Sequence, residues 1–159
     1  MTFRRILVAI DGGEAAGWAT DTGASLAAQL HAELAFVHVI PRALAYPTEL
    51  GFVEVERIAD LHERAEHYLK HAQKCAGAVR SDAIVREGVA PAEIIEAAKG
   101  WKADLIILGS HNRGRLSRLI LGSTAEAVVR GADCPVLVMT HPPKLGCDEA
   151  VAAGEVACV

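Results

Sequence analysis

The sequence has few of the features that assign a class of protein directly. Aromatic residues make up only 4% of its 159 residues, a composition that favours helices packed on a sheet over an aromatic-rich β-sandwich. No apolar run approaches the roughly 20 residues of a membrane-spanning helix, and the four cysteines include no C-x-x-C pair. We therefore expect no membrane segment, no cysteine metal site and a reduced, cytoplasmic setting.

A basic bias and a targeting segment are also lacking. The 16 Lys and Arg are outnumbered by 20 Asp and Glu, and the pI is about 6.0, whereas a protein whose main partner is nucleic acid carries a basic excess. The first residues lead straight into an apolar run, so we expect no signal peptide. We expect no nucleic-acid partner and a single domain, since domains usually hold about 100–200 residues.

What the sequence does contain is a regular alternation of short apolar runs and helical segments. This rhythm predicts right-handed βαβ units and a Rossmann-like α/β fold, an open doubly wound parallel sheet with helices on both faces. We expect strands at 5–10, 32–40, 82–88, 103–109 and 134–140, helices at 14–30, 54–76, 91–99 and 123–131, and a loop at 42–53. The helix at 54–76 is expected to be amphipathic, with an apolar face formed by Ile58, Leu61, Ala65, Tyr68, Leu69 and Ala72. The domain is expected to span 1–141, followed by a tail at 142–159.

One segment is unusual for a chain of net charge -4. Between Asp104 and Glu126 there is no carboxylate, and a basic, glycine-rich loop follows the apolar run of the fourth strand. Such a loop creates a local positive potential and suggests an anionic ligand. Its basic residues are His111, Arg113, Arg115 and Arg118, and its glycines are Gly109, Gly114 and Gly122.

A second glycine-containing turn, Asp11-Gly12-Gly13, follows the first strand. Ligands of open parallel sheets bind outside the carboxyl ends of the strands, where the strand order reverses. If the first and fourth strands are neighbours, both loops face one crevice. Glycines there allow backbone N–H groups to approach phosphate oxygens, and Asp11 suits a ribose hydroxyl or a bound Mg²⁺. The two loops together predict a nucleotide site.

The last helix adds donors to this site. The sequence Ser123–Glu126 reads as a capping box, so the helix is expected to begin at Ser123, and its N-terminus offers free N–H groups and a favourable dipole to an anion. Several blander interpretations stay open. Ser123 caps the helix with or without a phosphate, Asp11 merely caps the first helix, and Gly109 and Gly122 serve only tight packing. His67 and His71 stand at a spacing that can bind metal, but a solvated helix face is the simpler interpretation.

The sequence does not match the established catalytic and phosphate-binding motifs. Residues 109–116 have the glycine spacing of a Walker A loop, but Arg115 and Leu116 replace its lysine and its Ser or Thr. The G-x-G-x-x-G pattern of dinucleotide-binding proteins is missing from the first turn. No Ser/His/Asp or Cys/His set has a local signature. We therefore predict neither a P-loop NTPase nor a dedicated enzyme, and no catalytic residues.

At these residues the chain resembles the universal stress proteins from Arg4 to Thr140. The typical first strand and turn appear as "ILVAIDGG", the "HV" of the second strand as His38-Val39, and the closing strand as "CPVLVM". The family signature is glycine, two residues, glycine, nine residues, glycine, then Ser or Thr, which maps here to 109, 112, 122 and 123. Asn112 replaces its second glycine, and Gly13 stands where a serine is usual.

The resemblance implies a five-stranded sheet of order 3-2-1-4-5, a homodimer joined along the last strand, and an ATP site. In the ATP-binding branch adenine lies near the ends of the first two strands, at positions that match Ala9, Asp11 and Val39, and the phosphates and ribose lie on the glycine loop and on Gly122 and Ser123. ATP, AMP and ADP all stay open as ligands, with Mg²⁺ as a companion. The nucleotide-binding candidates are Ala9, Asp11, Val39, Gly88, Gly109, Ser110, His111, Asn112, Arg113, Gly114, Gly122, Ser123 and Thr124, and those for the dimer interface are Val136, Leu137 and Val138.

Three functions follow from these observations. The first is a nucleotide-binding stress-response protein, a dimeric module whose glycine loop is ordered by its ligand and then presented to a partner. The second is a dimer that binds no nucleotide and acts only through protein contacts, which Asn112 favours. The third is slow ATP hydrolysis at the same site, against which stands the lack of an obvious general base or phosphate-binding lysine.

Overall fold

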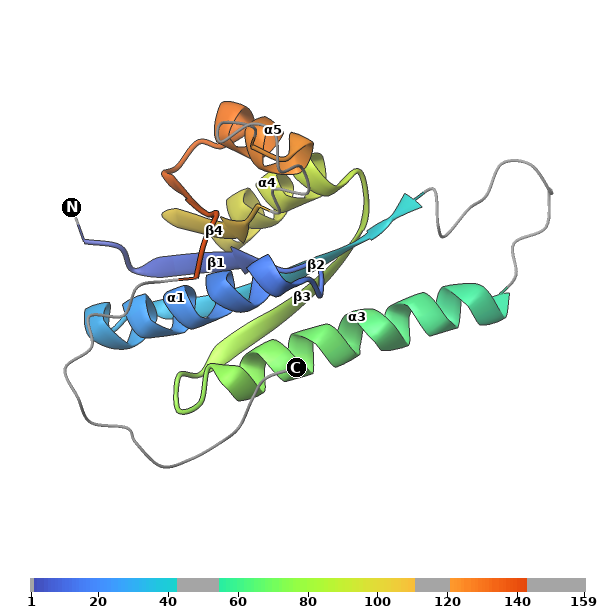
Figure 1. Cartoon of the computed structure of the whole chain (residues 1–159), viewed down its shortest axis with the longest axis horizontal. Coiled ribbons are helices and arrows are strands. Elements are labelled where there is room, and N and C mark those ends of the chain that lie inside the picture. Colours follow the sequence, from blue (N-terminus) through green and yellow to red (C-terminus); the bar gives the residue numbers. More distant parts are fainter. Residues whose placement is uncertain (1, 43–54, 111–120, 143–159) are drawn as a thin grey trace.

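The computed structural model describes residues 2–42, 55–110 and 121–142. Strands and helices alternate through these residues (Figure 1). The predicted loop at 42–53 and the tail at 142–159 lie almost wholly outside the described residues. The elements are β1 Arg5–Ala9, α1 Glu14–Leu30, β2 Glu33–Pro41, α3 Val55–Cys75, β3 Ser81–Gly88, α4 Ala90–Trp101, β4 Leu105–Gly109, α5 Ser123–Gly131 and β5 Val136–Met139.

The five strands form one sheet in the order β3-β2-β1-β4-β5, which confirms the predicted topology. Every neighbouring pair is parallel; Val8 on β1, for example, lies beside Phe36 on β2 and Ile107 on β4. Because the order reverses between β1 and β4, the carboxyl ends of these strands border the crevice where ligands bind in open sheets.

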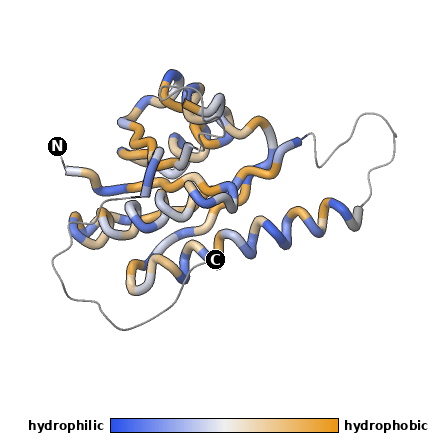
Figure 2. The backbone as a smooth tube through the Cα atoms, in the orientation of Figure 1, coloured by the Kyte–Doolittle hydropathy of each residue, from blue (hydrophilic) through white to orange (hydrophobic). Residues whose placement is uncertain are grey.

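Alternate residues of each strand face opposite layers of helices. Helices α1 and α3 cover one face, and α4 and α5 cover the other (Figure 1). The sheet is therefore buried on both faces, as continuously apolar strands indicate; Figure 2 shows hydrophobic central strands and an amphipathic α3. Side chains toward α1 and α3 include Ile6, Val8, Ile10, Leu34, Phe36 and Ile107, and those toward α4 and α5 include Leu7, Ala9, Val37, Val39, Ile106 and Leu108.

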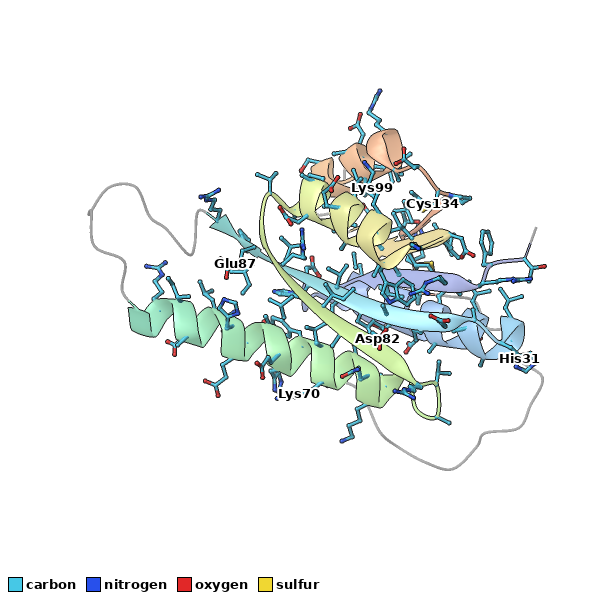
Figure 3. The ribbon with its side chains drawn as sticks, turned by 180° about the vertical axis from the view of Figure 1, so that it is seen from behind. His31, Lys70, Asp82, Glu87, Lys99 and Cys134 are labelled. Atoms are coloured by element: carbon cyan, nitrogen blue, oxygen red, sulfur yellow. The ribbon has the colours of Figure 1, made fainter. Side chains whose placement is uncertain are left out.

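Helix α3 lies along the edge of the sheet formed by β2 and β3. Its predicted apolar face is confirmed, because Ala65, Leu69 and Ala72 are buried while Lys70 points away from the sheet (Figure 3). The opposite face of the helix is charged and solvated. On the side toward the sheet, His62 Nε2 lies 2.7 Å from Glu87 Oε1 at the end of β3.

Helix α1 approaches the sheet closely because the residues between them are small. Ala15, Ala16, Ala19 and Ala27 are buried, and a Cβ added to Gly23 would lie 2.5 Å from Val8 Cγ2. The alanine-rich composition of this segment therefore sets how near α1 lies to β1 and β4.

At the amino ends of the strands, one carboxylate joins β1 to β4. Asp104 Oδ2 accepts the Arg4 N–H at 2.8 Å, and Oδ1 accepts the Arg5 N–H at 3.0 Å. The Arg5 guanidinium lies 4.3 Å from the Trp101 ring centroid and pairs with Glu33 at 3.1 Å. These contacts fix the sheet at the edge opposite the candidate site.

The observed bounds differ from the predictions by a few residues. Strands β4 and β5 are shorter than expected, since Ala103 and Asp104 lead into β4 as a turn and Pro135 supplies only a carbonyl, which accepts the Ile106 N–H. Helix α4 extends to Trp101 and ends at Lys102 in the left-handed conformation. None of the helices in the described ranges is long and apolar enough to cross a bilayer.

Candidate functional site

The turn after β1 is closed by its own aspartate. Asp11 Oδ1 accepts the Gly13 N–H at 2.9 Å, and Gly12 has φ +78, in the left-handed region that favours glycine. Helix α1 begins at Glu14 with Gly13 at its N-cap and no side-chain cap. Asp11 therefore shapes the turn without capping the helix, and it remains exposed at the carboxyl end of β1.

The predicted adenine contacts lie beside this turn. Ala9 and Val39 are each 8% exposed and belong to the α4/α5 face of the sheet. Because β1 and β2 are paired with Ala9 beside Val37, the end of β2 passes the end of β1 at this point. The structure thus places Ala9, Asp11 and Val39 at one edge.

On the other side of the crevice Ser110 connects three elements. Its backbone N–H donates to the Met139 carbonyl of β5 at 2.8 Å, and its Oγ accepts the Gly122 N–H at 3.0 Å. Ser110 is buried. Its hydroxyl oxygen and the Gly122 N–H therefore hold the start of α5 against the end of β4, and the Gly122 N–H is not a free donor for a ligand.

Helix α5 begins at Ser123 and ends at Gly131, as predicted, but the capping box at Ser123 is wrong. The N-cap is Gly122, whose carbonyl accepts the Glu126 N–H at 2.9 Å, and no side chain of the described residues caps the helix. The Glu126 carboxylate instead binds Arg130 at 2.9 Å. Ser123 is the first helical residue and is exposed. The first-turn N–H groups, including those of Ser123 and Thr124, have no acceptor within the helix, and the start of α5 lies beside the carboxyl end of β4.

The two glycines of β4 and α5 differ in what surrounds them. A Cβ on Gly109 would lie 2.4 Å from the carbonyl carbon and oxygen of Ala15, so glycine is required there for the approach of α1. A Cβ on Gly122 would meet only Ser110 Oγ, at 3.4 Å. Packing thus explains Gly109, whereas no steric contact with the described residues requires glycine at 122.

Other candidates are dispersed or fall outside the described ranges. Gly88 ends β3, on the far side of β2 from β1, and has φ +152; a Cβ there would lie 2.8 Å from Glu93 Cγ. Val136, Leu137 and Val138 form β5 at the sheet edge, with Leu137 37% exposed. His111, Asn112, Arg113 and Gly114 lie outside the described residues.

Two side chains that the site prediction omitted support the Asp11 turn from the α3 side. His38 Nδ1 donates to the Ile10 carbonyl at 2.9 Å, and the Tyr68 ring packs against Gly12. The sequence signals for them were available: His38 is a polar residue in the middle of an apolar run, and Tyr68 lies on the predicted apolar face of α3.

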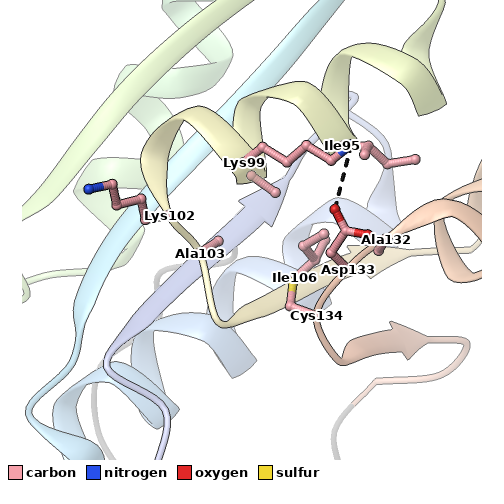
Figure 4. A pocket seen from close by; sticks show the side chains of 9 residues that line it. Ile95, Lys99, Lys102, Ala103, Ile106, Ala132, Asp133 and Cys134 are labelled. Carbon is pink, nitrogen blue, oxygen red and sulfur yellow. Dashed lines mark ion pairs between the residues drawn. The ribbon is translucent and has the colours of Figure 1, made fainter.

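Cavities near the described residues are of two kinds. One of about 100 Å³ lies near the amino ends of β4 and β5, beside the Lys99–Asp133 ion pair of 3.5 Å (Figure 4). Ligand pockets usually hold about 300–1,000 Å³, so this cavity is too small for a nucleotide. Burial raises the pKa of the Cys134 thiol in its wall, with Asp104 and Asp133 adding to the effect, so this cysteine stays neutral.

A larger groove, of about 880 Å³, runs between α1 and α3 and reaches the turn through Gly12 and Gly13. His67 and His71 lie in its lining. Over the described part of the chain, no group of three or more His, Cys, Asp or Glu side chains is arranged to hold a metal ion.

Comparison with known proteins places this geometry in a family. The model of the Universal stress protein family matches residues 2–140. A universal stress protein of Thermus aquaticus is 38% identical over 138 residues, covering 86% of this chain and 98% of that protein. The solved universal stress protein UspA from Lactobacillus plantarum has a TM-score of 0.76 at 24% identity and covers 88% of this chain and 99% of its own.

Two further structures with this fold are described as nucleotide complexes. A universal stress protein in complex with cAMP has a TM-score of 0.68 at 22% identity, covering 90% of this chain and 100% of its own. The Archaeoglobus fulgidus universal stress protein in complex with dAMP has a TM-score of 0.59 at 24% identity, covering 88% and 100%.

Proposed function

The chain belongs to the universal stress protein family, and we propose that it binds an adenine nucleotide across the carboxyl ends of β1, β2 and β4. ATP is the first candidate, with AMP and ADP as alternatives. The fold accommodates cAMP and dAMP in the two related structures. For this chain the proposal depends on its own residues, because identities of 22% and 24% speak for the fold alone.

The observation that carries the proposal is the uncapped start of α5. No side chain of the described residues caps its first-turn N–H groups, Ser123 is exposed, and among the described residues only Ser110 Oγ lies near an added Cβ at Gly122. These donors, the Ser123 hydroxyl and the positive end of the helix dipole would bind phosphate oxygens. The loop residues His111, Asn112, Arg113 and Gly114 would complete the phosphate site.

The opposite side of the crevice suits the nucleoside. Ala9 and Val39 offer a small apolar surface beside the exposed Asp11. In this arrangement adenine lies against the two apolar side chains, and the carboxylate accepts a ribose hydroxyl or holds Mg²⁺. Of the Asp11 oxygens, Oδ1 is engaged by the Gly13 N–H, so Oδ2 is the atom we assign to the ligand.

The biological role that we propose is a cytoplasmic, homodimeric stress-response module switched by its nucleotide. Leu137, exposed on the edge strand β5, would lie in the dimer contact with Val136 and Val138. A dimer that binds no nucleotide is the second candidate. One finding favours it, because packing against Ala15 already accounts for Gly109, which had been one reason to expect a phosphate.

Calorimetric titration with Mg-ATP and with AMP tests the proposal, after any co-purified nucleotide has been stripped and identified. We expect saturable binding, and about tenfold or greater weakening in Ser123→Ala, because a hydrogen bond to a charged group contributes about 1.5–3 kcal/mol. Ser25→Ala, the same change on α1 at a hydroxyl bonded to Gln29, is the matched control and should bind normally.

The possible results separate the two candidates. Absence of heat, with no co-purified nucleotide, would eliminate nucleotide binding and leave the dimer alone. Equal affinities of Ser123→Ala and the unmodified protein would mean that the ligand lies elsewhere.

A further inference from the structure

The Asp11 turn is supported by two side chains from other elements. His38 on β2 donates from Nδ1 to the Ile10 carbonyl at 2.9 Å, just before the turn. The Tyr68 ring on α3 packs so closely on Gly12 that a Cβ there would lie 2.6 Å from it. The His38 and Tyr68 rings are also in contact, with centroids 5.3 Å apart and an interplanar angle of 51°.

These contacts link the turn to α3, which otherwise lies apart from it. The groove of about 880 Å³ between α1 and α3 borders the turn, and Gly12 and Tyr68 both line it. Since the helix backbones are separated there, the Tyr68 ring bridges from α3 to the turn. At its far end the ring is held by the Arg64 guanidinium, whose Nη2 lies 3.5 Å from the hydroxyl oxygen.

We propose that His38 and Tyr68 are positioning residues that hold the Asp11 turn in the geometry that binds the nucleotide, so that loosening either one weakens nucleotide binding without removing a ligand contact. The consequence for affinity rests on the proposed function. The supporting contacts themselves belong to the unliganded protein and can be tested without any nucleotide.

The proposal makes nucleotide binding sensitive to acid through one histidine. Burial is the largest effect on His38 and lowers its pKa, and the nearby Arg64 charge acts in the same direction. The hydrogen bond to the Ile10 carbonyl and the charge of Asp11 oppose this shift. On α3 Tyr68 is in ring contact, and on β3 the paired residue is the uncharged Val85. Because the net effect lowers the pKa of His38, protonation destabilises the packed position of the ring relative to an open one, even though Nδ1 of the charged ring still donates to the Ile10 carbonyl.

Four substitutions distinguish the structural support of the Asp11 turn from the protonation of His38. In His38→Asn the amide nitrogen can replace Nδ1 as donor but does not titrate, whereas His38→Leu has no donor. Tyr68→Phe keeps the ring, and Tyr68→Ala removes it. His62→Asn is the control, because His62 lies on α3 but is bound to Glu87 on β3.

The first measurement uses the unliganded protein. Amide hydrogen exchange of Gly13, whose N–H donates to Asp11, is followed by NMR between about pH 5 and pH 8 and expressed as protection relative to the free peptide. We expect protection to fall with acid in the unmodified protein, in Tyr68→Phe and in His62→Asn, all of which keep His38. It should stay high in His38→Asn, and be low throughout in His38→Leu and Tyr68→Ala.

The second measurement is the affinity for AMP over the same pH range. His38→Asn should match the unmodified protein at about pH 8 and bind about threefold to tenfold more tightly at about pH 5, a difference equivalent to one hydrogen bond. Titration of the AMP phosphate affects both proteins equally and cancels in the ratio.

Two results would overturn the proposal: identical pH profiles for His38→Asn and the unmodified protein, or unchanged Gly13 protection in Tyr68→Ala. If AMP and Mg-ATP bind to none of the proteins, the proposed function fails, and the Gly13 protection alone decides whether the two residues hold the turn.

Discussion

Replacing Gly109 with alanine tests whether this glycine serves packing. The new Cβ would lie 2.4 Å from the carbonyl carbon and oxygen of Ala15 and 2.7 Å from its Cβ. These are mostly backbone atoms of α1, so the overlap can be relieved only by moving the helix away from β4. Adding a methyl group to a well-packed site typically costs about 1–3 kcal/mol, and backbone contact places this case at about 3 kcal/mol.

For a chain of this length, a loss of about 3 kcal/mol lowers Tm by about 6–12 °C. Gly100→Ala is the matched control, since Gly100 lies in α4 with nothing within 4 Å of an added Cβ. Alanine there should raise the free energy of unfolding by about 0.5–1 kcal/mol, because glycine loses more backbone entropy on folding. Thermal and urea unfolding measure both. A Tm of Gly109→Ala equal to that of the unmodified protein would refute the packing argument and return Gly109 to the list of phosphate contacts.

Three further predictions concern other parts of the molecule. Leu137→Lys should convert the proposed dimer to a monomer by light scattering at micromolar concentration, while Val129→Lys, at an apolar residue of α5 that is 45% exposed, should not; a monomeric unmodified protein would contradict the edge-strand dimer. Asp104→Asn removes one of the two acceptors for the Arg4 and Arg5 N–H groups and should lower the free energy of unfolding, measured in urea, by about 2 kcal/mol. An unchanged urea midpoint would show that these two hydrogen bonds do not stabilise the sheet. Burial lowers the pKa of His38 below about 6.5, so between the folded and the unfolded pKa the unfolded chain binds more protons than the folded protein. The contribution of His38 to the free energy of unfolding should therefore be complete above about pH 6.5 and be lost as the pH falls through the folded pKa. His38→Asn should lack this pH dependence of stability.

Much of the fold could be predicted because it depends on local patterns. Alternating strand and helix signals predict the βαβ units, and the apolar face of α3 was identifiable from its spacing. The strand order followed from the resemblance carried by residues such as 109, 122 and 123, since no local property of the sequence specifies which strands become neighbours.

The sequence predicted which strand ends carry the candidate site, because this follows from the order of strands and turns along the chain. The edge that carries Asp11 and Ser123 follows from the ends of β1 and β4, but the roles of individual atoms depend on distant partners. Gly109 packs on Ala15, and the Gly122 N–H is engaged by Ser110 Oγ. The capping-box prediction failed by a single residue, because helix α5 begins one position earlier than that motif requires. Tyr68 was assigned only to the apolar face, since its contact with Gly12 depends on how α3 packs beside β2 in the folded chain.

The hydrogen bond between Ser110 and Gly122 also bears on how the family site can change during evolution. It joins the last residue before the basic segment to the residue that caps α5, so the two ends of the segment are fixed by the fold itself. When the two ends of a connection are held, doubling its length costs only about 0.6 kcal/mol. The sequence between Ser110 and Gly122 can therefore change in length or in charge while β4 and α5 keep their places. The fold thus allows the anion that the segment suits to change without a change in the sheet.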